Sequence, residues 1–89
     1  MQMDPEVAPQ VLARLRRARG QIDGVIGMVE SGRDCTEIIT QLAAATKALN
    51  RAGFTVVSAG LRQCAAAEQR GEDPPMDPAQ LEKLFLTLS

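Results

Sequence analysis

The feature that most constrains this chain is a long run, residues 35–70, in which no proline occurs and apolar residues recur with helical spacing. Asp34 and Glu37 have the spacing of a capping box, which predicts Asp34 as the N-cap and Glu37 as the third helical residue. Gly71 stands where a glycine commonly ends a helix. The sequence therefore predicts one uninterrupted helix over 35–70. Its apolar face consists of Ile38, Ile39, Leu42, Ala45, Leu49, Ala52, Val56 and Leu61.

A helix of this length cannot be covered by a chain of 89 residues. At a rise of about 1.5 Å per residue, the predicted helix extends about 54 Å. A compact chain of this size has a radius of gyration of only about 12 Å. The apolar face therefore requires a second chain, and small proteins often gain their stability by oligomerising.

Cys35 and Cys64 lie near the two ends of this predicted helix. Their separation corresponds to about eight turns, so both thiols lie on one face, but about 43 Å apart along the axis. They cannot meet within one helix. If the helix packs antiparallel against its own copy about a two-fold axis, Cys35 can face Cys64 of the partner subunit. The pairs in this register, with the partner's residue second, are Cys35–Cys64, Ile38–Leu61, Leu42–Val57 and Leu49–Asn50.

Either cysteine alone would be interpreted as a small buried hydrophobic residue. Their shared face and their spacing favour a different interpretation, in which Cys35 and Cys64 form a reactive thiol pair between two chains. Each two-fold dimer would then contain two such pairs. The preceding helices of both chains would complete a four-helix core.

Shorter helices are predicted on either side of the long one. Pro5 and Pro9 restrict helix formation before residue 8, because proline is tolerated only in a first turn. Gly32 makes a tight connection, so the first two helices form an antiparallel hairpin. Asp77 caps the last helix. The prediction is an all-α chain with a flexible N-terminal arm, 1–8, and one domain, 9–89, whose helices span about 9–31, 35–70 and 78–88.

Composition excludes several functions. The chain contains no histidine, which removes histidine-based general base catalysis and zinc-finger patterns. No nucleophile–base pair or phosphate-binding loop is present, so an enzyme is not expected. No apolar run reaches membrane-spanning length. Two cysteines without a signal peptide predict a reducing, cytoplasmic location.

The formal net charge of −1 conceals a basic region. Cations outnumber acids in residues 13–70, whereas the tail from Gly71 is acidic. On charge alone, a solvated helix face is the simpler interpretation, and a helical dimer with no DNA role stays open. In a two-fold dimer, however, repeated cations could neutralise DNA phosphates. The candidates are Arg14, Arg17, Lys47 and Arg51.

Several motifs resemble one known family. Arg14-Leu15-(x)4-Gly20-Gln21-(x)2-Gly24, followed by Met28-Val29-Glu30-(x)4-Cys35, is similar to the opening of the copper-sensing operon repressor (CsoR/RcnR) family. Ile38-(x)2-Gln41-Leu42 and Leu61-Arg62-(x)-Cys64 continue the resemblance. It covers roughly residues 10–70, and the last helix, which lies in the acidic tail, also fits.

The resemblance implies an antiparallel four-helix dimer, usually a dimer of dimers, and hence a homodimer or homotetramer. It also implies a bacterial repressor that leaves operator DNA when its thiol site is occupied. Arg14 and Arg51 fall at basic positions linked to operator binding in the family. Lys47 is expected on the same surface.

Departures from the family pattern bear on the inducer. Copper sensors place a histidine four residues before the second cysteine, where this chain has Gly60. Nickel and cobalt sensors need further histidines, and formaldehyde sensors need proline directly after the initiator methionine, where this chain has Gln2. The remaining pair, Cys35 and Cys64, resembles the persulfide-sensing branch, which needs no cofactor. Two thiolates could also hold Cu(I) linearly, so Cu(I) stays open as the alternative inducer and ligand.

Overall fold

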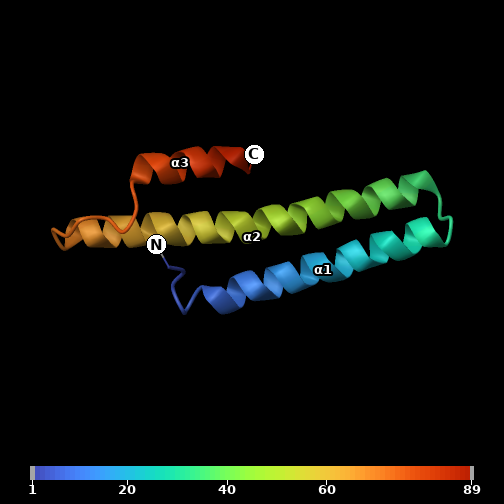
Figure 1. Ribbon diagram of the computed structural model, residues 1–89, viewed down its shortest axis with the longest axis horizontal. Coiled ribbons are helices and arrows are strands. Elements are labelled where there is room, and N and C mark those ends of the chain that lie inside the picture. Colours follow the sequence, from blue (N-terminus) through green and yellow to red (C-terminus); the bar gives the residue numbers. More distant parts are fainter. Residues whose placement is uncertain (1, 89) are drawn as a thin grey trace.

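The computed structural model describes residues 2–88, which form three α-helices and no strand (Figure 1). The helices are α1 (Ala8–Glu30), α2 (Cys35–Gln69) and α3 (Pro78–Thr87). This confirms the predicted all-α, three-helix chain. Each helix ends one residue before its predicted end, because Ser31, Arg70 and Leu88 are the C-cap residues.

The two terminal residues of the chain lie outside the part that the structure describes. Met1 begins the predicted arm, 1–8, and Ser89 ends the predicted domain, 9–89; both lie outside the described residues. Within the arm, Val7 is buried against Val11 and Ala59. The backbone carbonyl of Asp4 accepts hydrogen bonds from the N–H groups of Val7 and Ala8, at 2.9 and 3.1 Å. The flexibility of the arm as a whole stays a prediction.

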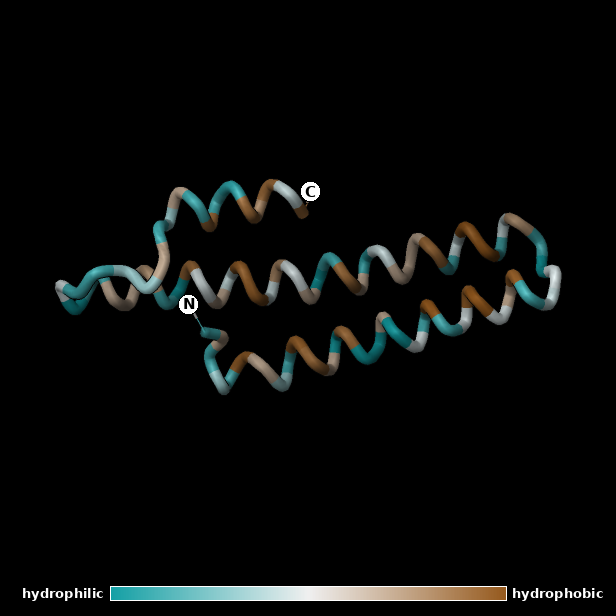
Figure 2. The backbone as a smooth tube through the Cα atoms, viewed as in Figure 1, coloured by the Kyte–Doolittle hydropathy of each residue, from teal (hydrophilic) through white to brown (hydrophobic). Residues whose placement is uncertain are grey.

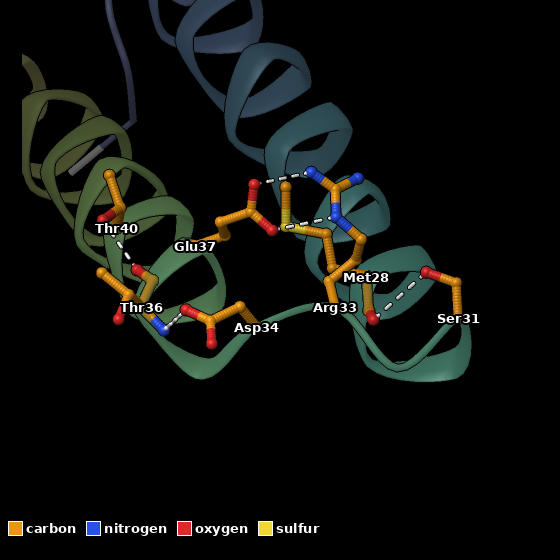
Figure 3. Close-up of polar contacts among 7 residues, drawn as sticks. All are labelled: Met28, Ser31, Arg33, Asp34, Thr36, Glu37 and Thr40. Atoms are coloured by element: carbon orange, nitrogen blue, oxygen red, sulfur yellow. Dashed lines mark hydrogen bonds and ion pairs between the residues drawn. The ribbon is translucent and has the colours of Figure 1, made fainter.

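Local sequence determines where α2 begins and ends. The carboxylate of Asp34 accepts a hydrogen bond of 3.0 Å from the backbone N–H of Thr36, as an N-cap residue does (Figure 3). At the other end Gly71 adopts a φ of 72°, which glycine reaches without the penalty of a side chain. The N–H of Glu72 then bonds to the carbonyl of Ala67 at 2.9 Å. These interactions terminate the helix in the manner of a Schellman motif.

The connection between α1 and α2 is a tight turn, and an ion pair joins its last part to the first turn of α2 (Figure 3). Gly32 has a φ of 71°, and the N–H of Arg33 bonds to the carbonyl of Met28 at 2.9 Å. The guanidinium of Arg33 donates two hydrogen bonds to the carboxylate of Glu37, at 2.8 and 2.9 Å. A turn this short makes α1 and α2 antiparallel neighbours.

Small buried residues hold α1 and α2 together. Val11, Ala18 and Val25 are buried on α1 at intervals of seven residues. Three alanines are buried on α2 at the same interval, namely Ala45, Ala52 and Ala59. A seven-residue repeat keeps one face of a helix toward its neighbour. Alanine at this contact allows the two backbones to approach closely.

The larger apolar side chains lie outside this contact. The molecule measures 58 × 24 × 14 Å, and its radius of gyration is 17.0 Å. Figure 2 shows hydrophobic positions recurring along both long helices. Ile39 is 64% exposed and Val29 is 59% exposed. The exposed apolar set on α1 and α2 consists of Leu12, Leu15, Ile22, Ile26, Val29, Ile39, Leu42, Leu49, Val56 and Leu61.

Helix α3 packs on α2, on the side away from α1 (Figure 1). Asp77 caps it by accepting a hydrogen bond of 3.0 Å from the N–H of Ala79. The rings of Phe54 and Phe85 have their centroids 5.3 Å apart. The side chain of Leu88 lies over Gly53 so closely that an added Cβ there would be 2.8 Å from Leu88 Cδ1. Gly53 is therefore a point of close approach between α2 and the residue that ends α3.

We expect the Asp34→Ala substitution to destabilise the fold by about 1 kcal/mol, because it removes the acceptor at the start of α2. Asp34→Asn should be close to neutral, since asparagine is an equally good N-cap. Urea unfolding at one fixed protein concentration measures both changes. No loss of stability in Asp34→Ala would show that the cap does not stabilise α2.

Candidate thiol site and basic groove

Cys35 is the first residue of α2, and its side chain is exposed. The carboxylate of Glu37, two residues further on, accepts two hydrogen bonds from the guanidinium of Arg33. Those hydrogen bonds, together with the charge of the guanidinium, lower the pKa of Glu37 and raise the pKa of Arg33. The thiol of Cys35 therefore lies at an exposed helix end, where the carboxylate of Asp34 accepts a backbone hydrogen bond and that of Glu37 is paired with Arg33.

Cys64 has the opposite environment. It is only 5% exposed and packs in a cluster with Val57 and Leu81. Its Sγ donates a hydrogen bond to the backbone carbonyl of Met76, at 3.4 Å. Met76 and Leu88 pack against the same cluster. The second thiol is thus enclosed by the segment that leads into α3 and by α3 itself.

The two cysteines do not come together within one chain. Both lie on α2, which is continuous over 35 residues. At about 1.5 Å per residue, their separation along the axis is about 43 Å. Within residues 2–88, no group of three or more Cys, Asp and Glu side chains is arranged to hold a metal ion. Gly60, one turn before Cys64, is buried and offers no ligand.

The four predicted DNA-binding cations do come together. They line one groove between α1 and α2, with a volume of about 320 Å³. No ion pair of the described residues involves any of them, because the two pairs present are Arg33–Glu37 and Arg70–Glu72. The groove is lined by Arg14, Arg17, Lys47 and Arg51 together with Gln21, Ala13, Ala44 and Ala48.

An adjoining hollow of about 500 Å³ extends the groove toward the end of α2 that carries Cys64. Arg14 and Arg51 line both cavities, so the two adjoin each other. The hollow is lined by Gln10, Arg14, Arg51, Phe54, Thr55, Ser58 and Arg62. No acidic side chain lines either cavity. Together they form the basic groove.

Sequence reasoning did not assign Thr55, Ser58 and Arg62 to this groove. The available signal was their spacing from Arg51, since positions four, seven and eleven residues further on share a helix face. One polar atom in the groove also lacks a partner. The side-chain oxygen of Gln21 is buried and accepts no hydrogen bond.

The sequence of this hairpin matches that of a known family. Residues 8–88 match the model of the family described as metal-sensitive transcriptional repressor. The chain belongs to this family. The expectation that the protein is not an enzyme is confirmed, because the family consists of transcriptional repressors.

Three curated relatives illustrate the match. The protein YrkD of Bacillus subtilis is 45% identical over 47 residues, covering 52% of this chain and 75% of that protein. The copper-sensing transcriptional repressor CsoR of Mycobacterium ulcerans is 39% identical over 56 residues, or 63% of this chain and 48% of that repressor. The copper-sensing repressor RicR of Mycobacterium tuberculosis is 35% identical over 51 residues, or 57% of this chain and 53% of RicR.

This chain therefore spans about half the length of the two copper sensors. No solved structure matches it. Within the described part of the chain, none of the helices combines the length and the apolar character needed to cross a membrane.

Proposed function

We propose that this protein is a repressor that binds operator DNA through the basic groove as a two-fold assembly. Binding ends when reactive sulfur bridges Cys35 of one subunit to Cys64 of the partner subunit. The observation that carries the proposal is the arrangement of α2, which bears two thiols on one face and unpaired cations on another. Family membership supports the repressor part of the proposal.

The basic groove supports DNA binding by its charge and its length. From Lys47 to Arg62 it follows α2 for about 22 Å. Cations held close together without acidic partners repel one another, and a phosphate backbone would neutralise them. Such contacts release counterions from DNA, which makes binding strongly dependent on salt. Contacts to phosphate fix position on the duplex, so sequence preference would come from other contacts or from DNA shape.

The exposed apolar face supports a second copy as the partner. One chain leaves the larger side chains of both long helices in solvent, including Leu42 at 49% exposure and Leu49 at 45%. Burial of apolar surface contributes about 25 cal/mol per Å², so a copy covering this face would be stabilised. In the antiparallel register, Leu42 faces Val57 of the partner subunit, and Cys35 faces the partner's Cys64. A dimer of two such dimers would give the homotetramer.

The proposed chemistry needs no external oxidant. The thiolate of Cys35 attacks the terminal sulfur of a small persulfide, RSSH, so that RS⁻ leaves and Cys35 carries the persulfide. The thiolate of the partner's Cys64 then attacks the Cys35 sulfur, forming a disulfide and releasing HS⁻. If both cysteines first become persulfides, their condensation gives a trisulfide and releases H₂S. The sulfur transferred from RSSH is the electron acceptor in each case.

Copper is the second candidate inducer, because two relatives carry the name copper-sensing repressor. Cu(I) prefers thiolate and imidazole ligands. Two thiolates from two subunits could hold it linearly. A third ligand next to Cys64 does not fit, since Gly60 has no side chain to provide one. This difference in the ligand set is the reason for placing reactive sulfur first.

We expect Arg51→Ala and Arg14→Ala to weaken operator binding and to reduce its salt dependence. Each lost phosphate contact should lower the slope of log K against log salt concentration by about 0.9. Arg16→Ala is the matched control, because Arg16 lines neither cavity. Fluorescence anisotropy with labelled operator DNA at several salt concentrations measures the slopes. Equal slopes in all three variants would contradict the claim that the basic groove contacts DNA phosphates. If the native protein shows no specific DNA binding, a helical dimer with no DNA role is favoured.

We expect a glutathione persulfide donor to produce covalently linked dimers, joined by a disulfide or, with the mass of one added sulfur, by a trisulfide. Operator affinity should fall by roughly 5- to 150-fold, the usual range of coupling between two sites. Cys35→Ala and Cys64→Ala should both remain on DNA. Intact-protein mass spectrometry and anisotropy measure the two effects. Unmodified protein with unchanged affinity would contradict sulfur sensing, and DNA release by Cu(I) in competition with a chelator would favour copper.

A further inference from the structure

The environment of Cys64 does not suit a thiol that must form a bond with another chain. Its side chain is 5% exposed, and its Sγ donates a hydrogen bond to the carbonyl of Met76. Leu81, at the start of α3, lies in the same buried cluster. The exposed thiol of Cys35 provides the contrast. Something in the enclosure around Cys64 therefore has to move before a partner can reach it.

The enclosing segment is a good candidate for movement, because little holds it. Helix α3 contacts α2 and makes no contact with α1. It has only 10 residues, and isolated helices this short are marginally stable in water. The linker 71–77 that leads into it lies outside any helix. Pairs such as Phe54–Phe85 are the kind of contact that keeps α3 in place.

The same segment lies where the partner subunit is expected. Gly53, Val57 and Cys64 lie beneath α3 or pack in the cluster that it closes. At 100° per residue, these positions lie on the same face of α2 as Cys35. In the antiparallel register the thiol end of the partner's α2 approaches this face. Helix α3 and the partner subunit therefore compete for the surface around Cys64.

We propose that Met76 and α3 form a lid over Cys64, and that the lid must lift before Cys64 can react. The role of this lid in sensing rests on the proposed function, to which it adds a structural step. Once Cys64 carries an additional sulfur atom, the packed space among Val57, Leu81 and Met76 cannot hold it without displacement, because overpacking a close-packed site is destabilising. The bridge then holds the lid open, so the position of α3 reports the state of the thiol.

Alkylation with iodoacetamide tests the lid on the full-length chain without DNA or persulfide. In Cys35→Ala, Cys64 should react at least tenfold more slowly than Cys35 does in Cys64→Ala. A tenfold difference corresponds to an opening free energy of about 1.4 kcal/mol. Mass spectrometry over time gives both rates. Equal rates would overturn the proposal. Because the reagent needs no inducer, failure of the lid is distinguishable from failure of sulfur sensing.

Substitution at Gly53 tests whether α3 is the barrier. In the Cys35→Ala background, Gly53→Leu should speed alkylation of Cys64, since a side chain there collides with Leu88. Gly24→Leu is the matched control, because nothing lies within 4 Å of a Cβ at Gly24. Leu88→Ala, which removes the contact from the other side, should also speed the reaction, and circular dichroism checks that each variant is folded. The proposal would be overturned if alkylation of Cys64 stays slow in both Gly53→Leu and Leu88→Ala. It would also be overturned if Gly24→Leu speeds the alkylation as much as they do.

Discussion

One helix of 35 residues organises this protein, and its own chain covers it incompletely. Helix α1 protects a face of α2 through small side chains, and α3 protects part of another. The remaining apolar surface is exposed because 89 residues cannot surround a helix of this length. This exposed apolar surface is the physical reason for expecting a second subunit. It also explains why both thiols could act together although one chain keeps them far apart.

Different faces of α2 carry different parts of the proposed function. Buried alanines at seven-residue intervals allow α1 to approach closely, and the groove along that contact gathers the unpaired cations. The face with the cysteines is open at Cys35 and closed by Met76 and α3 at Cys64. Because all these faces belong to one continuous helix, a change at the thiol end could alter the relative placement of basic grooves in an assembly. That link would connect sulfur chemistry with release of DNA.

Much of the fold follows from local sequence. Asp34, Asp77 and the glycines with positive φ determine where the helices begin and end, and such signals act over a few residues. The clustering of Arg14, Arg17, Lys47 and Arg51 was also predictable, because an antiparallel hairpin brings the two sets together. The enclosure of Cys64 was not. It depends on the direction in which the linker 71–77 turns and on the close approach of Leu88 to Gly53, and neither leaves a periodic pattern in the sequence.

The central claim is that Cys35 of one subunit faces Cys64 of the partner subunit, and subunit mixing tests it most directly. Cys35→Ala and Cys64→Ala are each treated with a short bis-maleimide, separately and after unfolding and refolding together. The antiparallel arrangement predicts covalent dimers only in the mixture, where one subunit supplies each thiol. Covalent dimers in either variant alone, or none in the mixture after a reaction time long enough for Cys64 itself to be alkylated, would contradict it.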